Sequence, residues 1–392
     1  MKGEWGRKMA GRKRGANQQN REGCGRAAFG LAAYTKGAGR GLAGPQISGR
    51  ARARAGRRRF WRGPVWARGR SFRPILPPRP VSDQARYRAF CATAPDVPVF
   101  AQPWYLDACA EGGTWGAVLA HEADRPVAAL PYFTKQKGPF HYATMPPFVK
   151  WLGPYVLPAL RADSAREAAA VAALLAALPP LAAFKQNCYP TLSNWLPFYW
   201  QGFRQTTYYT YRLPELRNLA RVEAGLSTGI RRDIRLARAQ VRVVHDLPLA
   251  EFWRVNSLSF GRQGLAVPYS EAQFQRLDAA LAAHGARQLF FAVDAQERVH
   301  SVVYLIWDAT TAYFHLAGDD PALRASGAGM LLTWEAIRYA SEVLGLACFD
   351  FEGSMLPGVE RVRRRFGAVQ TPYSFVWKYN SRALALLEKL RR

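Results

Sequence analysis

The stretch from Tyr313 to Glu352 carries the clearest structural signal in this sequence. It begins with a β-like run, Tyr313-Phe-His-Leu-Ala, and passes through Arg324-Ala-Ser-Gly-Ala-Gly329 into a helical segment. It ends with Leu346-Ala-Cys-Phe-Asp-Phe-Glu352. This pattern predicts a strand, a Gly-rich loop, a helix and a second strand. Such a loop leaves backbone N–H groups unpaired at a helix N-terminus, where the helix dipole favours negative charge, so it suits a pyrophosphate.

The loop differs from the two common nucleotide-binding loops. Met330 and Leu331 stand where a Walker loop needs Gly-Lys-Ser/Thr, and Arg324 stands where a Rossmann loop needs its first glycine. Gly327 and Gly329 would let the backbone approach a ligand, and Arg324 would add a charged donor. The alternative is that the two glycines only shape the start of a helix.

The charge of the chain is concentrated at its N-terminus. The net charge is +27, but residues 1–80 hold 21 of the 55 basic residues and only two of the 28 acidic ones. This segment has no apolar periodicity, so we expect a disordered basic Gly/Arg/Pro-rich tail. It could act as an arm for nucleic acid or an anionic membrane, or have no function. The rest of the chain is only mildly basic, which makes nucleic-acid binding a secondary hypothesis.

The cysteines give no sign of a metal site or a disulfide framework. The five cysteines lie far apart, without C-x-x-C spacing. We therefore expect reduced thiols, no metal and a cytoplasmic protein. The most apolar run, 168–178, is too short to span a bilayer.

The chain repeats one pattern of elements with an offset of 165 residues. Seven of the 28 positions in 181–208 are identical at the positions 165 residues further on, among them Gly202 with Gly367 and Gln205 with Gln370. This indicates an internal duplication of one α/β unit. Residues 159–164 of the first unit, opposite the Gly-rich loop, contain no glycine. If the loop of the second unit binds the ligand, the first unit is predicted to be degenerate and to shape the binding site of a second substrate, the acceptor.

These features together resemble a known superfamily. The Arg-x-x-Gly-x-Gly loop between a strand and a helix is similar to the pyrophosphate loop of GNAT acyltransferases. Two such units, with Phe349-Asp-Phe-Glu-Gly-Ser354 and Arg364-Arg-Phe-Gly367, resemble Fem-type transferases and FemAB-related GNAT proteins. The resemblance spans about residues 84–385. It implies an α/β (α+β) fold of two tandem GNAT-like domains, with mixed sheets flanked by helices, over 84–215 and 216–392.

The resemblance also implies a donor site and an N-acyltransferase activity. The donor would be acyl-CoA, with acetyl-CoA as the favoured form. The residues expected to bind it are His315, Leu316, Ala317, Arg324, Ser326, Gly327, Ala328, Gly329 and Met330. The acceptor would be an amine of a small molecule or a cell-envelope precursor, entering between the domains. A Fem-like transferase that uses aminoacyl-tRNA is the alternative, and a non-catalytic nucleic-acid-binding protein is a third hypothesis.

The expected catalytic residues follow the loop. Alternation along a strand puts Phe349 and Phe351 on one face and Asp350 and Glu352 on the other. Two neighbouring carboxylates push one another's pKa apart, which suits a base for the amine proton. The alternative is that they are solvated or paired with Arg361, Arg363 or Arg364. GNAT enzymes often offer a tyrosine after this strand as the acid for the thiolate, and Tyr373 is the nearest substitute.

Overall fold

The computed structural model of this chain describes residues 84–245, 247–262, 264–353 and 355–390. The expectations for the tail at 1–80 therefore fall outside the described residues. The helices, including short 3-10 (η1, η2) and π (η3) turns, are α1 (Gln84–Thr93), η1 (Val99–Ala101), α2 (Pro103–Cys109), α3 (Pro158–Arg161), α4 (Ser164–Ala176), α5 (Leu196–Trp200), α6 (Leu219–Gly225), α7 (Thr228–Arg238), α8 (Leu249–Gly261), α9 (Glu271–Ala283), η2 (Arg324–Ser326), α10 (Ala328–Arg338), η3 (Tyr339–Val343), α11 (Pro357–Arg365) and α12 (Arg382–Lys389).

The strands form one mixed sheet that runs through the whole molecule. They are β1 (Thr114–Glu122), β2 (Arg125–Lys137), β3 (Phe140–Thr144), β4 (Tyr155–Val156), β5 (Ala183–Asn187), β6 (Arg204–Leu213), β7 (Arg242–Val244), β8 (Arg287–Val293), β9 (Val299–Trp307), β10 (Thr311–Asp319), β11 (Cys348–Asp350) and β12 (Val369–Tyr379). The order is β1-β2-β3-β5-β12-β6-β11-β10-β9-β8-β7, with β4 paired to β2. The expected mixed α/β architecture with flanking helices is confirmed.

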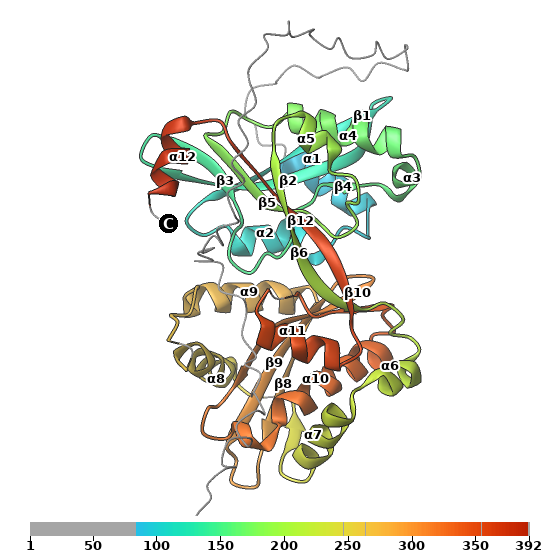
Figure 1. The fold of residues 1–392 in the computed structure, drawn as a ribbon, viewed down its shortest axis with the longest axis vertical. Helices are drawn as coiled ribbons and strands as arrows, with labels where there is room; N and C mark the ends of the chain where they lie inside the picture. Colours follow the sequence, from blue (N-terminus) through green and yellow to red (C-terminus); the bar gives the residue numbers. More distant parts are fainter. Residues whose placement is uncertain (1–83, 246, 263, 354, 391–392) are drawn as a thin grey trace, which may run out of the picture.

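The molecule has two lobes, joined by the long strands β6 and β12, which cross between them (Figure 1). Here the first half is 84–215 and the second half is 216–390. The first half ends with β6, but β6 pairs with β11 of the second half. The second half ends with β12, which pairs with β5 of the first half. The halves therefore exchange their last strands.

The pairing registers preserve the 165-residue offset. Tyr208 lies opposite Tyr373, its equivalent in the repeat, at the centre of the β6/β12 pair. Lys185 of β5 pairs with Trp377 of β12, and their equivalents in the repeat, Asp350 of β11 and Arg212 of β6, are likewise paired. The strands β5 and β11 thus occupy equivalent places, as the repeat predicted. The expectation of separate sheets was wrong, because strand exchange fuses them into one.

The helices cover the sheet over three apolar clusters. Helices α4 and α5 cover one face of the first lobe, where Leu174, Phe184 and Phe198 are buried. Helices α7, α10 and α11 cover the second lobe around Ile234, Leu331 and Phe351 in a separate cluster. The third cluster contains residues of both halves, Phe100 and Tyr105 with Phe252 and Tyr313 among them. The two halves therefore share one core and pack as a single body.

Candidate active site

The site lies where β10 and β11 separate. These parallel strands pair only from Thr311 to Tyr313, against Cys348 to Asp350; beyond that point β10 runs on to Asp319 while β11 has ended. The register of β10 against β9 also shifts between Phe314 and Leu316, which makes His315 the extra residue of a β-bulge. A bulge leaves its extra residue outside the ladder. The strands thus open a notch, and His315 stands at it.

A buried acid and a buried histidine meet in this notch. His315 Nδ1 lies 2.7 Å from Glu352 Oε1, and both side chains are almost fully buried. Glu352 has a φ of +56°, in the left-handed region that a non-glycine residue seldom adopts. Its backbone N–H donates to Asp350 Oδ1 at 2.8 Å, which holds this turn. Backbone strain of this kind often accompanies functional sites, so the conformation supports a role for Glu352.

The first half completes the surroundings of His315. Tyr105 of α2 donates its hydroxyl hydrogen to the Phe148 carbonyl at 2.9 Å, and the same oxygen lies 3.3 Å from His315 Nε2. The His315 ring also packs near the rings of Phe100 and Phe148. Because the Tyr105 hydrogen goes to the carbonyl, its oxygen accepts from Nε2, so Nε2 carries a proton. Nothing in the sequence marked Tyr105, since α2 lies about 200 residues before β10.

Asp350 has different partners from Glu352. Thr210 Oγ1 donates to Asp350 Oδ1 at 2.5 Å, and Arg212 Nε lies 2.9 Å from Oδ2, both from β6 of the first half. Burial raises the pKa of Asp350 to about 6, against the opposing influence of Arg212. Asp350 is thus tied into the exchanged strand. Of the three arginines that sequence reasoning offered as partners, Arg363 is near this site and Arg364 pairs with Glu360 instead.

Arg363 closes the notch on the other face of the sheet. Its guanidinium lies 4.7 Å from the ring centre of Phe314 and 4.9 Å from that of Phe351. Phe349 and Phe351 are both in the second-lobe apolar cluster, as the alternation predicted. Burial lowers the pKa of Arg363 to about 9, and the nearby carboxylates Glu352 and Asp350 oppose that shift. The site therefore combines two acids, two arginines and a histidine at one strand junction.

Tyr373 lies away from this junction, in an aromatic group. Its buried ring is 5.7 Å from Trp151 and 5.9 Å from Tyr208, and Lys150 Nζ lies 5.9 Å from its ring centre. Trp151 in turn lies 6.0 Å from Tyr313 of β10. The role of Tyr373 as the acid stays a prediction.

The Gly-rich loop has the expected shape, but the chain itself occupies most of its N–H groups. Gly327 has a φ of +74° and begins α10. The N–H groups of Ser326, Gly327, Ala328 and Met330 all have acceptors in the same loop. The loop therefore does not present an open set of donors in this conformation.

Side chains and a neighbouring helix also hold the loop. Arg324 Nε lies 3.4 Å from the buried carboxylate of Asp319. Ser326 Oγ lies 2.9 Å from His300 Nδ1, and His300 Nε2 lies 2.9 Å from Asp294. A Cβ at Gly327 would come within 3.3 Å of the Asp233 carbonyl on α7. Sequence reasoning missed the contacts of the loop with His300 and with Asp233 of α7, because both residues lie outside the loop motif.

The two remaining donor-site candidates lie within β10. Leu316 and Ala317 are buried and belong to different apolar clusters, so they face opposite sides of the sheet. The Ala317 carbonyl accepts from Asn256 Nδ2 at 3.0 Å. His315 is thus the member of this run whose side chain reaches the notch. Among the described residues, no group of three His, Cys, Asp or Glu could hold a metal ion.

Comparisons with known proteins match part of this geometry to a known domain. Residues 225–365 match the family model described as acetyltransferase (GNAT) domain, and this range contains the bulge, the loop and both acids.

Solved structures extend the comparison to the whole fold. FemX matches 78% of this chain and 98% of its own chain, at a TM-score of 0.56 and 12% identity, which establishes a shared fold. L-PGS from Bacillus licheniformis is similar over 80% of this chain and 97% of its own, at a TM-score of 0.48 and 11% identity. A tandem GNAT protein from the clavulanic acid biosynthesis pathway covers 75% and 93%, at 0.43 and 13%. No curated protein matches the sequence.

Proposed function

We propose that this protein is an N-acyltransferase of the GNAT type that moves an acyl group, specifically an acetyl group, from acyl-CoA to a primary amine. The observation that carries the proposal is the buried contact between His315 and Glu352 at the notch between β10 and β11. The match of residues 225–365 to the GNAT domain supports acyl transfer as the reaction class. The amine would belong to a small molecule or to a cell-envelope precursor, and would enter between the two halves.

The hydrogen bonds suggest how the amine loses its proton. Tyr105 fixes a proton on His315 Nε2, so the contact between Nδ1 and Glu352 Oε1 holds one further proton. Oε2 of Glu352 then accepts a proton from the amine as its nitrogen attacks the thioester carbonyl. The C–S bond breaks, and the CoA thiolate takes up a proton, for which Tyr373 is the proposed acid. The backbone N–H of His315, outside the ladder, is placed to polarise the carbonyl.

A test of this mechanism measures CoA release from acetyl-CoA with a thiol reagent, in the presence of a simple primary amine such as glycinamide. General-base catalysis contributes about 10²–10⁴-fold. We therefore expect Glu352→Gln to lower kcat by about 100-fold or more, with an unchanged Kd for CoA by calorimetry. Glu360→Gln, on α11 and bonded to Tyr211, is the matched control. Turnover by Glu352→Gln at the wild-type rate would remove Glu352 from the mechanism.

The closed loop favours a second candidate donor. An aminoacyl-tRNA would not need a pyrophosphate cradle, and three arginines on the exposed face of α7, Arg231, Arg232 and Arg235, offer charge for phosphates. Mass spectrometry of ligands that co-purify with the protein separates the two donors. CoA supports the first proposal, and tRNA supports the second.

The structure changes how the loop should be probed. The sequence suggests Gly327→Val as a variant that weakens CoA binding with little loss of stability. In the structure this side chain would strain a left-handed backbone and press on the Asp233 carbonyl of α7, so a loss of stability is expected. Calorimetry of CoA with the wild type is therefore the first measurement, and absence of binding would set acyl-CoA aside.

A further inference from the structure

The outer surface of the first lobe bears exposed aromatic side chains. Helix α5 is anchored by Phe198, which is buried, while Leu196, Tyr199 and Trp200 are 45, 59 and 66% exposed. Large aromatic side chains at this exposure are uncommon on a protein surface without a partner. Core packing therefore explains Phe198 but not its neighbours Tyr199 and Trp200.

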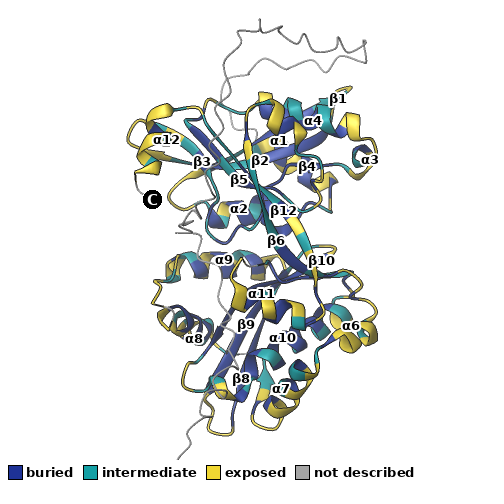
Figure 2. Cartoon of the chain, in the orientation of Figure 1, coloured by how far each residue is buried: buried dark blue, intermediate teal, exposed yellow. Residues whose placement is uncertain are grey.

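The C-terminal part of α4 and the turn after it, beside α5, add an uncharged outer surface. Residues 168–180 contain only alanine, valine, leucine and proline. Val171, Leu174 and Leu175 are buried against the sheet, whereas Ala176, Ala177 and Pro180 are exposed (Figure 2). The outer face of a surface helix is normally polar; here charged side chains are confined to the first turn of α4, with Arg166 paired to Glu122. Gln201, next to α5, donates to the Ala172 carbonyl at 3.0 Å, so the two helices form one surface.

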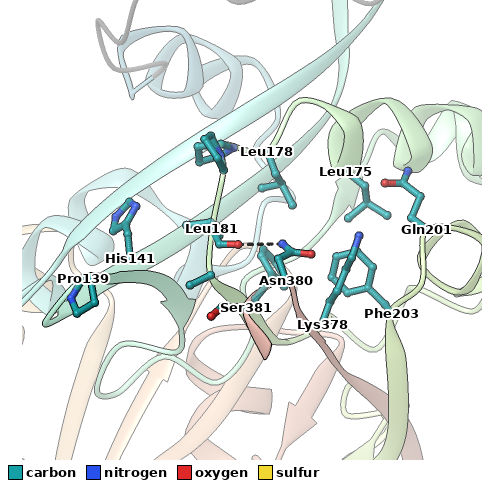
Figure 3. Close-up of a pocket in the computed structure, with 14 residues that line it drawn as sticks. Pro139, His141, Leu175, Leu178, Leu181, Gln201, Phe203, Lys378, Asn380 and Ser381 are labelled. Carbon is teal, nitrogen blue, oxygen red and sulfur yellow. Dashed lines mark hydrogen bonds between the residues drawn. The ribbon is translucent and has the colours of Figure 1, made fainter. Parts of the chain in front are cut away.

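A groove of about 630 Å³ opens along the same surface (Figure 3). Its walls include Leu175, Leu178, Leu181 and Phe203, and Gln201 links it to α5. The lining contains one lysine, Lys378, and no carboxylate. The Lys378 ammonium lies 5.4 Å from the Phe203 ring centre. The groove thus combines apolar walls with a positive charge, which suits an apolar chain with an anionic head.

We propose that this α4/α5 face, made of 168–180, Leu196, Tyr199, Trp200 and the groove with Lys378, docks on the surface of an anionic lipid bilayer. Trp and Tyr side chains favour the headgroup level of a membrane, where an apolar ring and a polar edge are both accommodated. The groove takes one acyl chain, and Lys378 pairs with the headgroup. The net charge of +27 draws the chain to such a surface. This inference is independent of the acyl-transfer proposal.

The docking is peripheral. Within the described part of the chain, no helix is long and apolar enough to cross a bilayer. Helix α5 spans five residues and lies on the folded lobe, so its side chains reach only the interface. The bilayer therefore meets a preformed face of the protein, and the opposite lobe with its notch stays in water.

The experiment floats the full-length protein with vesicles of phosphatidylglycerol and phosphatidylcholine at about 0.5 M KCl. High salt shortens the Debye length to a few ångströms, so attraction by basic residues elsewhere, including those of the tail, is screened. We expect the double variant Tyr199→Ser, Trp200→Ser to reduce vesicle binding at least tenfold. Val343→Ser, at an apolar residue of the second half that is also 66% exposed, is the matched control and should bind like the wild type.

Two further measurements complete the test. Lys378→Glu should weaken binding to anionic vesicles more than binding to pure phosphatidylcholine. Light scattering should show a monomer in solution; a dimer that the double variant abolishes would assign the face to a second copy of this chain and overturn the proposal. Equal vesicle binding by the double variant and the wild type would overturn it as well. Thermal midpoints confirm that each variant is folded, and Leu196→Ser is the substitute for any variant that is not.

Discussion

Replacing Tyr105 by phenylalanine tests how the first half supports the candidate site. The hydroxyl of Tyr105 donates to the Phe148 carbonyl and accepts from His315 Nε2, and all of these groups are buried. The variant leaves a buried carbonyl and a buried ring N–H without partners. Each such loss costs about 1–3 kcal/mol, so the free energy of unfolding should fall by about 2–6 kcal/mol.

Tyr87 provides the matched control. It is equally buried, and its hydroxyl donates to the Ala101 carbonyl at 2.8 Å rather than contacting His315. Its other hydrogen-bonding neighbour is the Cys91 thiol, a weak partner, so Tyr87→Phe should cost mainly the first of the two losses, about 1–3 kcal/mol. Thermal unfolding of both variants gives the comparison, with about 2 °C or less per kcal/mol for a chain of this length. The fall in Tm should be about twice as large for Tyr105→Phe.

A second readout separates positioning from simple stability. His315 released from Tyr105 can change tautomer or turn, so the pH dependence of kcat for acetyl-CoA turnover should shift in Tyr105→Phe. It should stay as in the wild type in Tyr87→Phe, whatever its Tm. Equal falls in Tm together with identical pH profiles would refute the role assigned to Tyr105.

Three further results are expected. Gly353→Ala should lower the free energy of unfolding by about 3 kcal/mol or more, because a Cβ there would stand 2.1 Å from the Tyr209 carbonyl on β6 at a φ of +67°. Gly345→Ala, at a φ of +63° in open space, should lower it by about 1 kcal/mol. Equal losses for the two variants in urea unfolding would contradict this packing. The pKa of Asp350 is raised to about 6 in the folded state, against about 3.9 in the unfolded state, so between these pH values the folded state binds one more proton than the unfolded state. The Tm should therefore fall as the pH rises from about 4 to 6, and Asp350→Asn should make this dependence of Tm on pH weaker. A chain that begins at Val81 should keep the full-length Tm and activity, and aggregation of that chain would defeat the expectation.

Local patterns in the sequence were sufficient to predict the elements around the site. Alternation placed Phe349 and Phe351 on one face, and the Gly-rich loop predicted the helix that follows it, α10. The boundaries were less accurate: β11 ends at Asp350, because Glu352 already has left-handed backbone. That conformation depends on contacts with His315 and β6, which no local pattern contains.

Long-range partners could not be predicted from one sequence. Tyr105, Thr210 and Arg212 join the site through the packing of α2 and the exchange of β6, and none of them belongs to a motif. The 165-residue offset predicted which strands are equivalent, but not that the last strands change places. Two separate sheets and one fused sheet satisfy the same repeat, and the pairings of β5 with β12 and of β6 with β11 distinguish them.

The strand exchange also sets the order in which this chain can fold during synthesis. Strand β5 lacks one of its two partner strands until β12 (Val369–Tyr379), which follows all other strands of the described sheet, has left the ribosome. Until then β5 is an open edge, and such edges invite pairing with other chains. A nascent chain of this protein is therefore more dependent on chaperones than one in which each half closes as it emerges.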